Sequence, residues 1–208
     1  MRKTVLLVLA IALVPAYLFA VDGQVLINQS TVMATGGFPY RIAQPGSYKL
    51  TGNLTMTTTV SGNFNGTDVA IEIDSGQVTL DLNGFTISIV NNFAFPGHAY
   101  YAISGFGFGI TIRNGNIVIA SASVLTDVSK ACGICLPPAR FAQIEGITIV
   151  ADPNAAAEAT SVNVNVGSIM RGVSTNVSSN ISCPSVLIGT FGLGAVAPSC
   201  ATVGAIAP

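Results

Sequence analysis

The segment 78–90, with the sequence VTLDLNGFTISIV, alternates between apolar and polar residues except at one point. The alternation slips by one position at Asn83-Gly84 and then resumes. A period of two predicts β-strand, because successive side chains of a strand point to opposite faces. Asn and Gly accept positive φ at low cost, so the slip predicts a bend between two strands. The apolar side chains on the predicted inner side are Val78, Leu80, Leu82, Phe85, Ile87 and Ile89.

The same pattern returns about 30 residues further along the chain. A repeat of between about 20 and 50 residues, built from strands and bends, predicts a solenoid. Each coil of a solenoid buries its apolar face only against its neighbours, so we expect interior stacks such as Ile87, Ile117 and Ile147. The matches at a spacing of 30 are Leu80 with Ile110, Leu82 with Ile112, Ile87 with Ile117, Ile89 with Ile119, Ile117 with Ile147, Ile119 with Ile149, and Val69, Ile71 and Ile73 with Ala99, Tyr101 and Ile103.

Two segments, VAIEIDSGQVTLDLNGFTI (69–87) and GFGITIRNGNIVI (107–119), resemble coils of the pectin lyase-like superfamily. GSYKLTGNLTM (46–56) resembles the strand that often precedes the first coil in that superfamily. The resemblance implies an all-β fold, a single-stranded right-handed parallel β-helix. The repeat length leaves room for about four to six coils. The superfamily contains lyases, hydrolases, epimerases and proteins with no known activity, so function has to be argued from a site.

Residues 1–20 have the layout of a secretory signal peptide, with a charged start at Arg2-Lys3 and an apolar run up to Ala20. We therefore expect a secreted, periplasmic or cell-surface protein with no stable membrane span after cleavage. An uncleaved membrane anchor is the alternative. The rest of the chain is predicted to form an N-terminal cap (21–45), the parallel β-helix (46–170) and an irregular last coil with a C-terminal tail (171–208).

The composition narrows the function classes. Half of the 208 residues are apolar and only 8% are charged, with a formal net charge of −1. This excludes a disordered chain, and the lack of a basic patch argues against nucleic-acid binding. No charged residue follows Arg171. We interpret the uncharged tail as a last cap, or as an apolar patch that meets a partner or a second copy of the chain.

Four cysteines matter if the protein is exported, because disulfides persist outside the cytosol. Cys183 and Cys200 lie in the tail and are candidates for a disulfide that closes the last coil. Cys132 and Cys135 form a C-x-x-C without the βαβ context of a redox motif or the further ligands of a zinc site. We expect Cys135 to pack within a coil or to pair locally.

Six of the 15 aromatic residues fall in the window 91–109, together with the only histidine. Sugar rings stack on aromatic faces through their C–H groups. A carbohydrate-binding platform formed by His98, Tyr100, Phe106 and Phe108 is therefore one interpretation. The other is that the Phe side chains pack over a coil, since buried aromatics contribute strongly to cores. Tyr101 is expected at an interior position.

Few residues are candidates for a catalytic role. Glu72 and Asp74 alternate with Ile71 and Ile73, so both carboxylates should point outward, about 6.6 Å apart along one strand. Arg113 is a candidate for contact with an acidic sugar. These three residues would form the minimal site of a lyase or hydrolase, with calcium implied only for a lyase. The alternative is that they are charges that keep an outer face soluble.

We therefore expect a secreted, non-catalytic β-helix without a cofactor, which binds polysaccharide or packs at the cell surface. Two alternatives stay open. One is a polysaccharide lyase or glycoside hydrolase of the superfamily that the chain resembles, and the other is a purely structural or self-assembling solenoid.

Overall fold

The computed structural model describes residues 23–58, 67–91, 99–121, 130–136, 139, 141–152, 159–164, 167–176, 180–181, 186–189, 191–192 and 201–203. The predicted signal peptide, His98 and the Cys183–Cys200 pair lie outside these residues. The described part contains 18 strands and one helix, α2 (Gln29–Ala34). The expectation of an all-β chain is confirmed.

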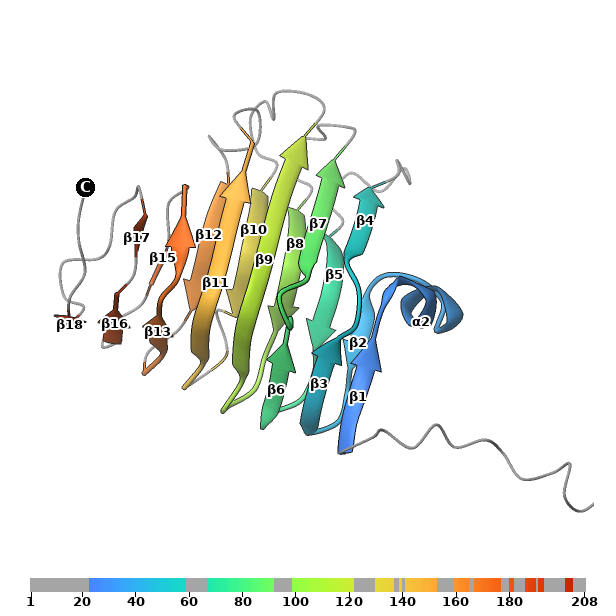
Figure 1. Cartoon of the computed structure of the whole chain (residues 1–208), viewed down its shortest axis with the longest axis horizontal. Coiled ribbons are helices and arrows are strands. Elements are labelled where there is room, and N and C mark those ends of the chain that lie inside the picture. Colours follow the sequence, from blue (N-terminus) through green and yellow to red (C-terminus); the bar gives the residue numbers. More distant parts are fainter. Residues whose placement is uncertain are drawn as a thin grey trace, which may run out of the picture.

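Every strand pairs with its neighbours in parallel, and the strands form two sheets (Figure 1). The larger sheet has the order β1 (Gln24–Ile27), β3 (Gly46–Leu50), β6 (Val78–Asp81), β9 (Thr111–Ser121), β11 (Gln143–Ala151), β13 (Ile169–Arg171), β16 (Val186–Ile188) and β18 (Ala201–Val203). Beside this path lie β4 (Leu54–Thr58), β7 (Thr86–Asn91), β14 (Ser174–Thr175) and β17 (Phe191–Gly192). The smaller sheet has the order β15 (Asn180–Ile181), β12 (Ala159–Val164), β10 (Lys130–Leu136), β8 (Ala99–Gly105), β5 (Thr67–Ile73) and β2 (Tyr40–Ile42).

The chain visits each of the two sheets once in each repeat. β5 lies in the smaller sheet, β6 and β7 follow in the larger sheet, and β8 returns to the smaller sheet beside β5. The arrows of β8, β10 and β12 point opposite to those of β9 and β11 (Figure 1). This arrangement is consistent with a parallel solenoid.

The repeat is 32 residues from β3 to β6, from β6 to β9 and from β9 to β11, so the predicted spacing of 30 is wrong for several pairs. It shortens to 26 residues from β11 to β13 and to 17 residues from β13 to β16. Leu80 pairs with Ile112, and Ile117 pairs with Ile149 instead of Ile147. Likewise, β5 pairs with β8 at a spacing of 32, not 30. Ile87 does pair with Ile117, as predicted.

The two spacings coexist because the bend between β6 and β7 holds two extra residues. Asp81 pairs with Arg113 and Thr86 with Asn116, so residues 82–85 lie opposite residues 114–115. A shift of two residues leaves each side chain on the same face of its strand, whereas a shift of one would reverse it. The apolar pattern therefore predicts which side chains point inward but cannot distinguish 30 from 32.

The predicted bend at Asn83-Gly84 is confirmed and recurs in the following coils. Asn83, Asn114, Gly146 and Gly172 have φ values of 52°, 58°, 58° and 56°. Only Gly and, less often, Asn or Asp adopt this left-handed conformation routinely. These residues divide the larger sheet into a half before the bend and a half after it.

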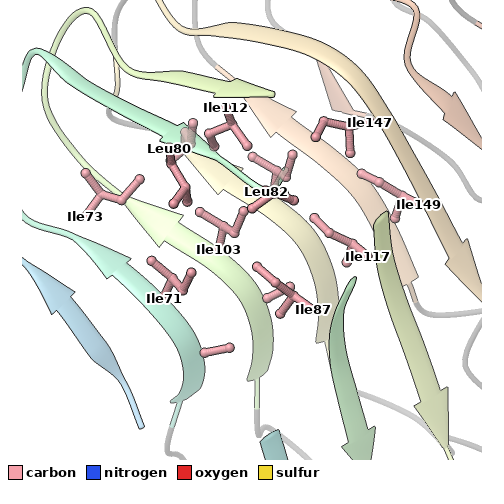
Figure 2. Close-up of a cluster of buried hydrophobic side chains, with 14 of the residues drawn as sticks. Ile71, Ile73, Leu80, Leu82, Ile87, Ile103, Ile112, Ile117, Ile147 and Ile149 are labelled. Carbon is pink, nitrogen blue, oxygen red and sulfur yellow. The ribbon is translucent and has the colours of Figure 1, made fainter. Parts of the chain in front are cut away.

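The core lies between the two sheets and is built mainly from Ile and Leu. Figure 2 shows side chains from both sheets meeting there. The residues labelled in it are all fully buried: Ile71, Ile73, Leu80, Leu82, Ile87, Ile103, Ile112, Ile117, Ile147 and Ile149. Burial of each such side chain stabilises the fold by about 1.5–3 kcal/mol. The stacked coils therefore form one continuous hydrophobic core.

The alternation changes phase within β8, which reverses the prediction for two tyrosines. Ala102 and Ile103 are consecutive residues and both are buried. As a result Tyr100, before the phase change, lies in the core and is only 3% exposed. Tyr101, expected inside, is partly exposed instead.

Helix α2 lies at the β1 end of the stack (Figure 1). The Asn28 side chain accepts a hydrogen bond from the Thr31 amide, the Thr31 hydroxyl accepts one from the Asn28 amide, and Val32 enters the core. The side-chain amide of Gln29 bonds both backbone groups of Thr55 in β4, accepting from N–H at 2.9 Å and donating to the carbonyl at 3.3 Å. Gln29 thus occupies the position that a further strand would take beside β4.

Candidate functional site

The turn from the smaller sheet into the larger sheet has the same backbone conformation in successive coils. Gln77, Gly109, Phe141 and Gly167 come just before β6, β9, β11 and β13, and their φ values are 55°, 67°, 57° and 82°. Two of these residues, Gln77 and Phe141, are not glycine, although a left-handed φ is uncommon for residues of their kind. We call this edge of the molecule the aromatic corner, defined by residues 106–109 and 141.

Three phenylalanines are exposed at the aromatic corner. Phe106 and Phe108 lie between β8 and β9, and Phe141 lies between β10 and β11 in the next coil. Their exposed fractions are 52%, 58% and 64%. The other large apolar side chains that are exposed in the described residues lie elsewhere, at Val25, Leu26 and Met33 near the β1 end and at Val150 in β11.

Backbone hydrogen bonds hold the segment 106–108 against the preceding coil. The Phe106 amide donates to the Ile73 carbonyl at 3.0 Å, and the Gln77 amide donates to the Phe108 carbonyl at 2.8 Å. A Cβ added to Gly107 would lie only 3.0 Å from the Gly76 nitrogen. The two coils therefore approach each other closely through glycine at this point, which fixes the backbone that carries both rings.

Each of two rings lies beside a glycine in the adjacent coil. A Cβ at Gly76 would be 3.3 Å from Cδ1 of Phe108, and a Cβ at Gly167 would be 2.9 Å from Cδ1 of Phe141. Any larger side chain at either glycine would displace the ring. The glycines thus make room for rings that pack on one side and remain more than half exposed.

The aromatic residues exposed in the structure differ from those of the predicted platform. Phe106 and Phe108 are more than half exposed, so neither ring is buried over a coil, although Phe108 packs on one side against Gly76. Tyr100 is buried in the core and is not part of an exposed surface. Phe141 was not predicted. The available signal was its position one repeat after Gly109, followed by Gly167 in the next coil, but finding it required the correct register.

The residues of the predicted lyase or hydrolase site lie in two separate groups. Glu72 and Asp74 both contact Arg41 of β2, at 2.9 and 3.4 Å. Arg113 lies in the larger sheet, where its Nε is 3.0 Å from Oδ2 of Asp81. The structure therefore gives Glu72 and Asp74 a shared guanidinium partner but does not bring Arg113 to them.

Arg113 belongs to a column of alternating charge on the larger sheet, just before the bend. The strand pairs place Lys49 beside Asp81, Asp81 beside Arg113, Arg113 beside Glu145, and Glu145 beside Arg171. Neighbouring strands are about 4.8 Å apart, so each charge faces one of opposite sign in the next coil. We call these five residues the charge column.

Cys132 and Cys135 form a disulfide within β10. This confirms the expected local pairing, and both residues are buried. They pair with Tyr101 and Ser104 of β8, on either side of the phase change. The disulfide in β10 thus lies beside the phase change at Ala102-Ile103 of β8. In the described part of the chain no group of three or more His, Cys, Asp or Glu residues is placed to hold a metal ion.

No helix within the described ranges has the length and apolar character needed to cross a membrane. Comparisons of the chain with protein-family models, curated proteins and solved structures gave no match. The aromatic corner is therefore interpreted from its own geometry.

Proposed function

We propose that this protein is an exported, non-catalytic parallel β-helix that binds carbohydrate at the aromatic corner. The observation that carries the proposal is the exposure of Phe106, Phe108 and Phe141 on two adjacent coils at one edge. A right-handed stack of about four to six coils is part of the proposal. The parallel pairing and the 32-residue repeat of the middle coils support a solenoid of this kind. Export rests on the signal-peptide pattern of residues 1–20.

Exposed aromatic rings suit sugars for a physical reason. The face of a phenyl ring is electron-rich, and the axial C–H groups of a pyranose are weakly positive, so the two surfaces attract when stacked. Stacking also removes apolar area of both partners from water, at about 25 cal/mol per Å². Pairs of aromatic rings gain about 0.5–1.5 kcal/mol beyond burial. We expect a gain of this order for each ring that stacks on a sugar, so several rings are needed for useful affinity.

The charged groups support binding without catalysis. A general acid or base has to be free to exchange a proton with the reacting atoms. Glu72 and Asp74, the predicted hydrolytic pair, both form ion pairs with Arg41. Arg113 forms an ion pair with Asp81. Neither group lies at the aromatic corner.

The proposal is tested by binding to a glycan array and to insoluble polysaccharides, with reducing-end release measured in parallel. The test variant replaces Phe106, Phe108 and Phe141 with alanine. The control variant is Met33→Ala, which removes an equally exposed apolar side chain from α2, away from the corner. Circular dichroism melting verifies that both variants fold.

We expect wild type and Met33→Ala to bind the same glycans and the triple variant to lose binding by at least about tenfold. Equal binding by the triple variant, or no binding of any glycan by wild type, would refute a carbohydrate site at this corner. Release of sugar ends would refute the non-catalytic part of the proposal.

A further inference from the structure

We infer that the ligand is a glycan chain of several sugar units that lies along the stacking direction of the coils and contacts Phe108 and Phe141 at the same time. This inference rests on the proposed function and adds the length of the ligand to it.

The first observation is the direction in which the two rings lean. Phe108 lies against Gly76, one coil nearer to the β1 end, whereas Phe141 lies against Gly167, one coil further away from it. The backbones of Phe108 and Phe141 are in adjacent coils, but the rings point away from each other along the stack.

The separation of the rings follows from the coil spacing. Phe108 covers its own coil and the one before, and Phe141 covers its own coil and the one after. The ring centres are thus about two coil spacings apart, or roughly 10 Å. One pyranose cannot span this distance, so a ligand in contact with both rings must contain several sugar units.

The surface between the rings is open for such a ligand. Phe106, Gly107, Phe108 and Gly109 alternate ring and glycine, and no heavy atom lies within 4 Å of a Cβ built on Gly109. Glycine lets a ligand approach the backbone closely, where peptide groups can bond to sugar hydroxyls. A protein partner would instead favour apolar side chains clustered around a central anchor.

The separation of the rings also gives a chain an advantage over a short sugar, because only a chain contacts both rings at once. Two linked contacts raise affinity because the second forms at a high effective concentration.

The inference is tested by calorimetric titration of the full chain with two pairs of sugars, cellobiose with cellohexaose and maltose with maltohexaose. We expect the hexaose of at least one pair to bind at least about tenfold more tightly than its disaccharide. In Phe108→Ala or in Phe141→Ala alone, this advantage of the hexaose should fall to less than about twofold. Val150→Ala, an exposed apolar change in β11 away from the corner, should keep the full advantage.

The outcomes separate the two proposals. Binding of a disaccharide as tightly as its hexaose, lost in Phe108→Ala, would keep the carbohydrate site and overturn the ligand chain that spans both rings. No binding of any of these sugars, together with self-association that the Phe108→Ala change abolishes, would show that the corner binds a second copy and would overturn both proposals.

Discussion

Substitution of Gly105 tests how closely the coils approach each other inside the smaller sheet. A Cβ added at this buried position would lie 2.7 Å from both Cβ and the carbonyl oxygen of Ile73. Real Cβ atoms do not come this close to other atoms, so β5 or β8 has to move. Overpacking of a core costs about 1–3 kcal/mol, and we expect Gly105→Ala to reach the upper end because one of the obstructing atoms belongs to the backbone.

The matched control is Gly52→Ala. A Cβ at Gly52 would meet only Cβ of Asn28, at an ordinary distance of 3.7 Å. This change should be neutral or stabilise the fold by about 0.4–1 kcal/mol, because alanine restricts the unfolded chain. For a chain of this length about 1 kcal/mol corresponds to roughly 2–4 °C, so Gly105→Ala should lower the melting temperature by about 6–12 °C.

Melting followed by circular dichroism, together with urea unfolding, measures both variants. The reasoning fails if Gly105→Ala melts at or above the wild-type temperature, or if Gly52→Ala is destabilised as strongly. The first result would mean that the register between β5 and β8 is not the one that places Gly105 beside Ile73. The second would mean that the loss comes from replacing glycine and not from the close approach of the two coils.

Three further predictions concern the β1 end, the charge column and alkaline pH. Gln29→Ala removes the amide that covers β4, so we expect a loss of about 1–2 kcal/mol and concentration-dependent self-association, measured by light scattering. Arg113→Ala removes the guanidinium that contacts the mostly buried carboxylate of Asp81 and leaves Lys49 as its neighbour in the charge column, so we expect a loss of about 1 kcal/mol in urea unfolding. Burial raises the pKa of Tyr40 and of Tyr48 above 10.0, and the nearby Tyr48 adds to the effect on Tyr40. The unfolded chain releases these phenol protons first, so stability from this source is complete below about pH 10 and is lost as the pH rises beyond it.

Each of these predictions has a matched comparison. Ser30→Ala, an exposed change in the same helix, should not cause self-association, and equal association of both variants would rule out the role of Gln29. Arg41→Ala removes a more exposed arginine and should cost less than Arg113→Ala. In an ultraviolet titration some tyrosines should ionise late, and a single transition at the ordinary pKa would contradict the predicted loss of stability.

The strands were predictable from the sequence because their inner faces are almost uniformly Ile, Leu and Val. What the pattern could not supply was the register. The two extra residues at the bend after Leu82 keep every side chain on its face, so nothing in the alternation reveals them. The phase change at Ala102-Ile103 made the prediction fail for a different reason. It reverses the face of β8 on which Tyr100 lies. A small residue such as Ala fits either face of a strand, so Ala102 does not reveal the change.

The candidate site was predicted in part for the same reason. Phe106 and Phe108 stood out by composition, because six of the 15 aromatic residues fall in the window 91–109. Phe141 lies far from them in sequence, and only the stacking of coils places it at the same corner. The separation of Glu72 and Asp74 from Arg113 likewise follows from which sheet each strand joins, and that is a property of the whole topology.

The charge column constrains how such a chain can change in length. Its signs alternate from coil to coil, in the order Lys49, Asp81, Arg113, Glu145 and Arg171. Deletion of the single coil that carries Asp81 would place Lys49 beside Arg113, and duplication of one coil would place a charge beside its own copy. Removal or insertion of two coils together restores the alternation. Growth or shortening of the stack by recombination is therefore favoured in pairs of coils, by a parity rule that the charge column alone imposes.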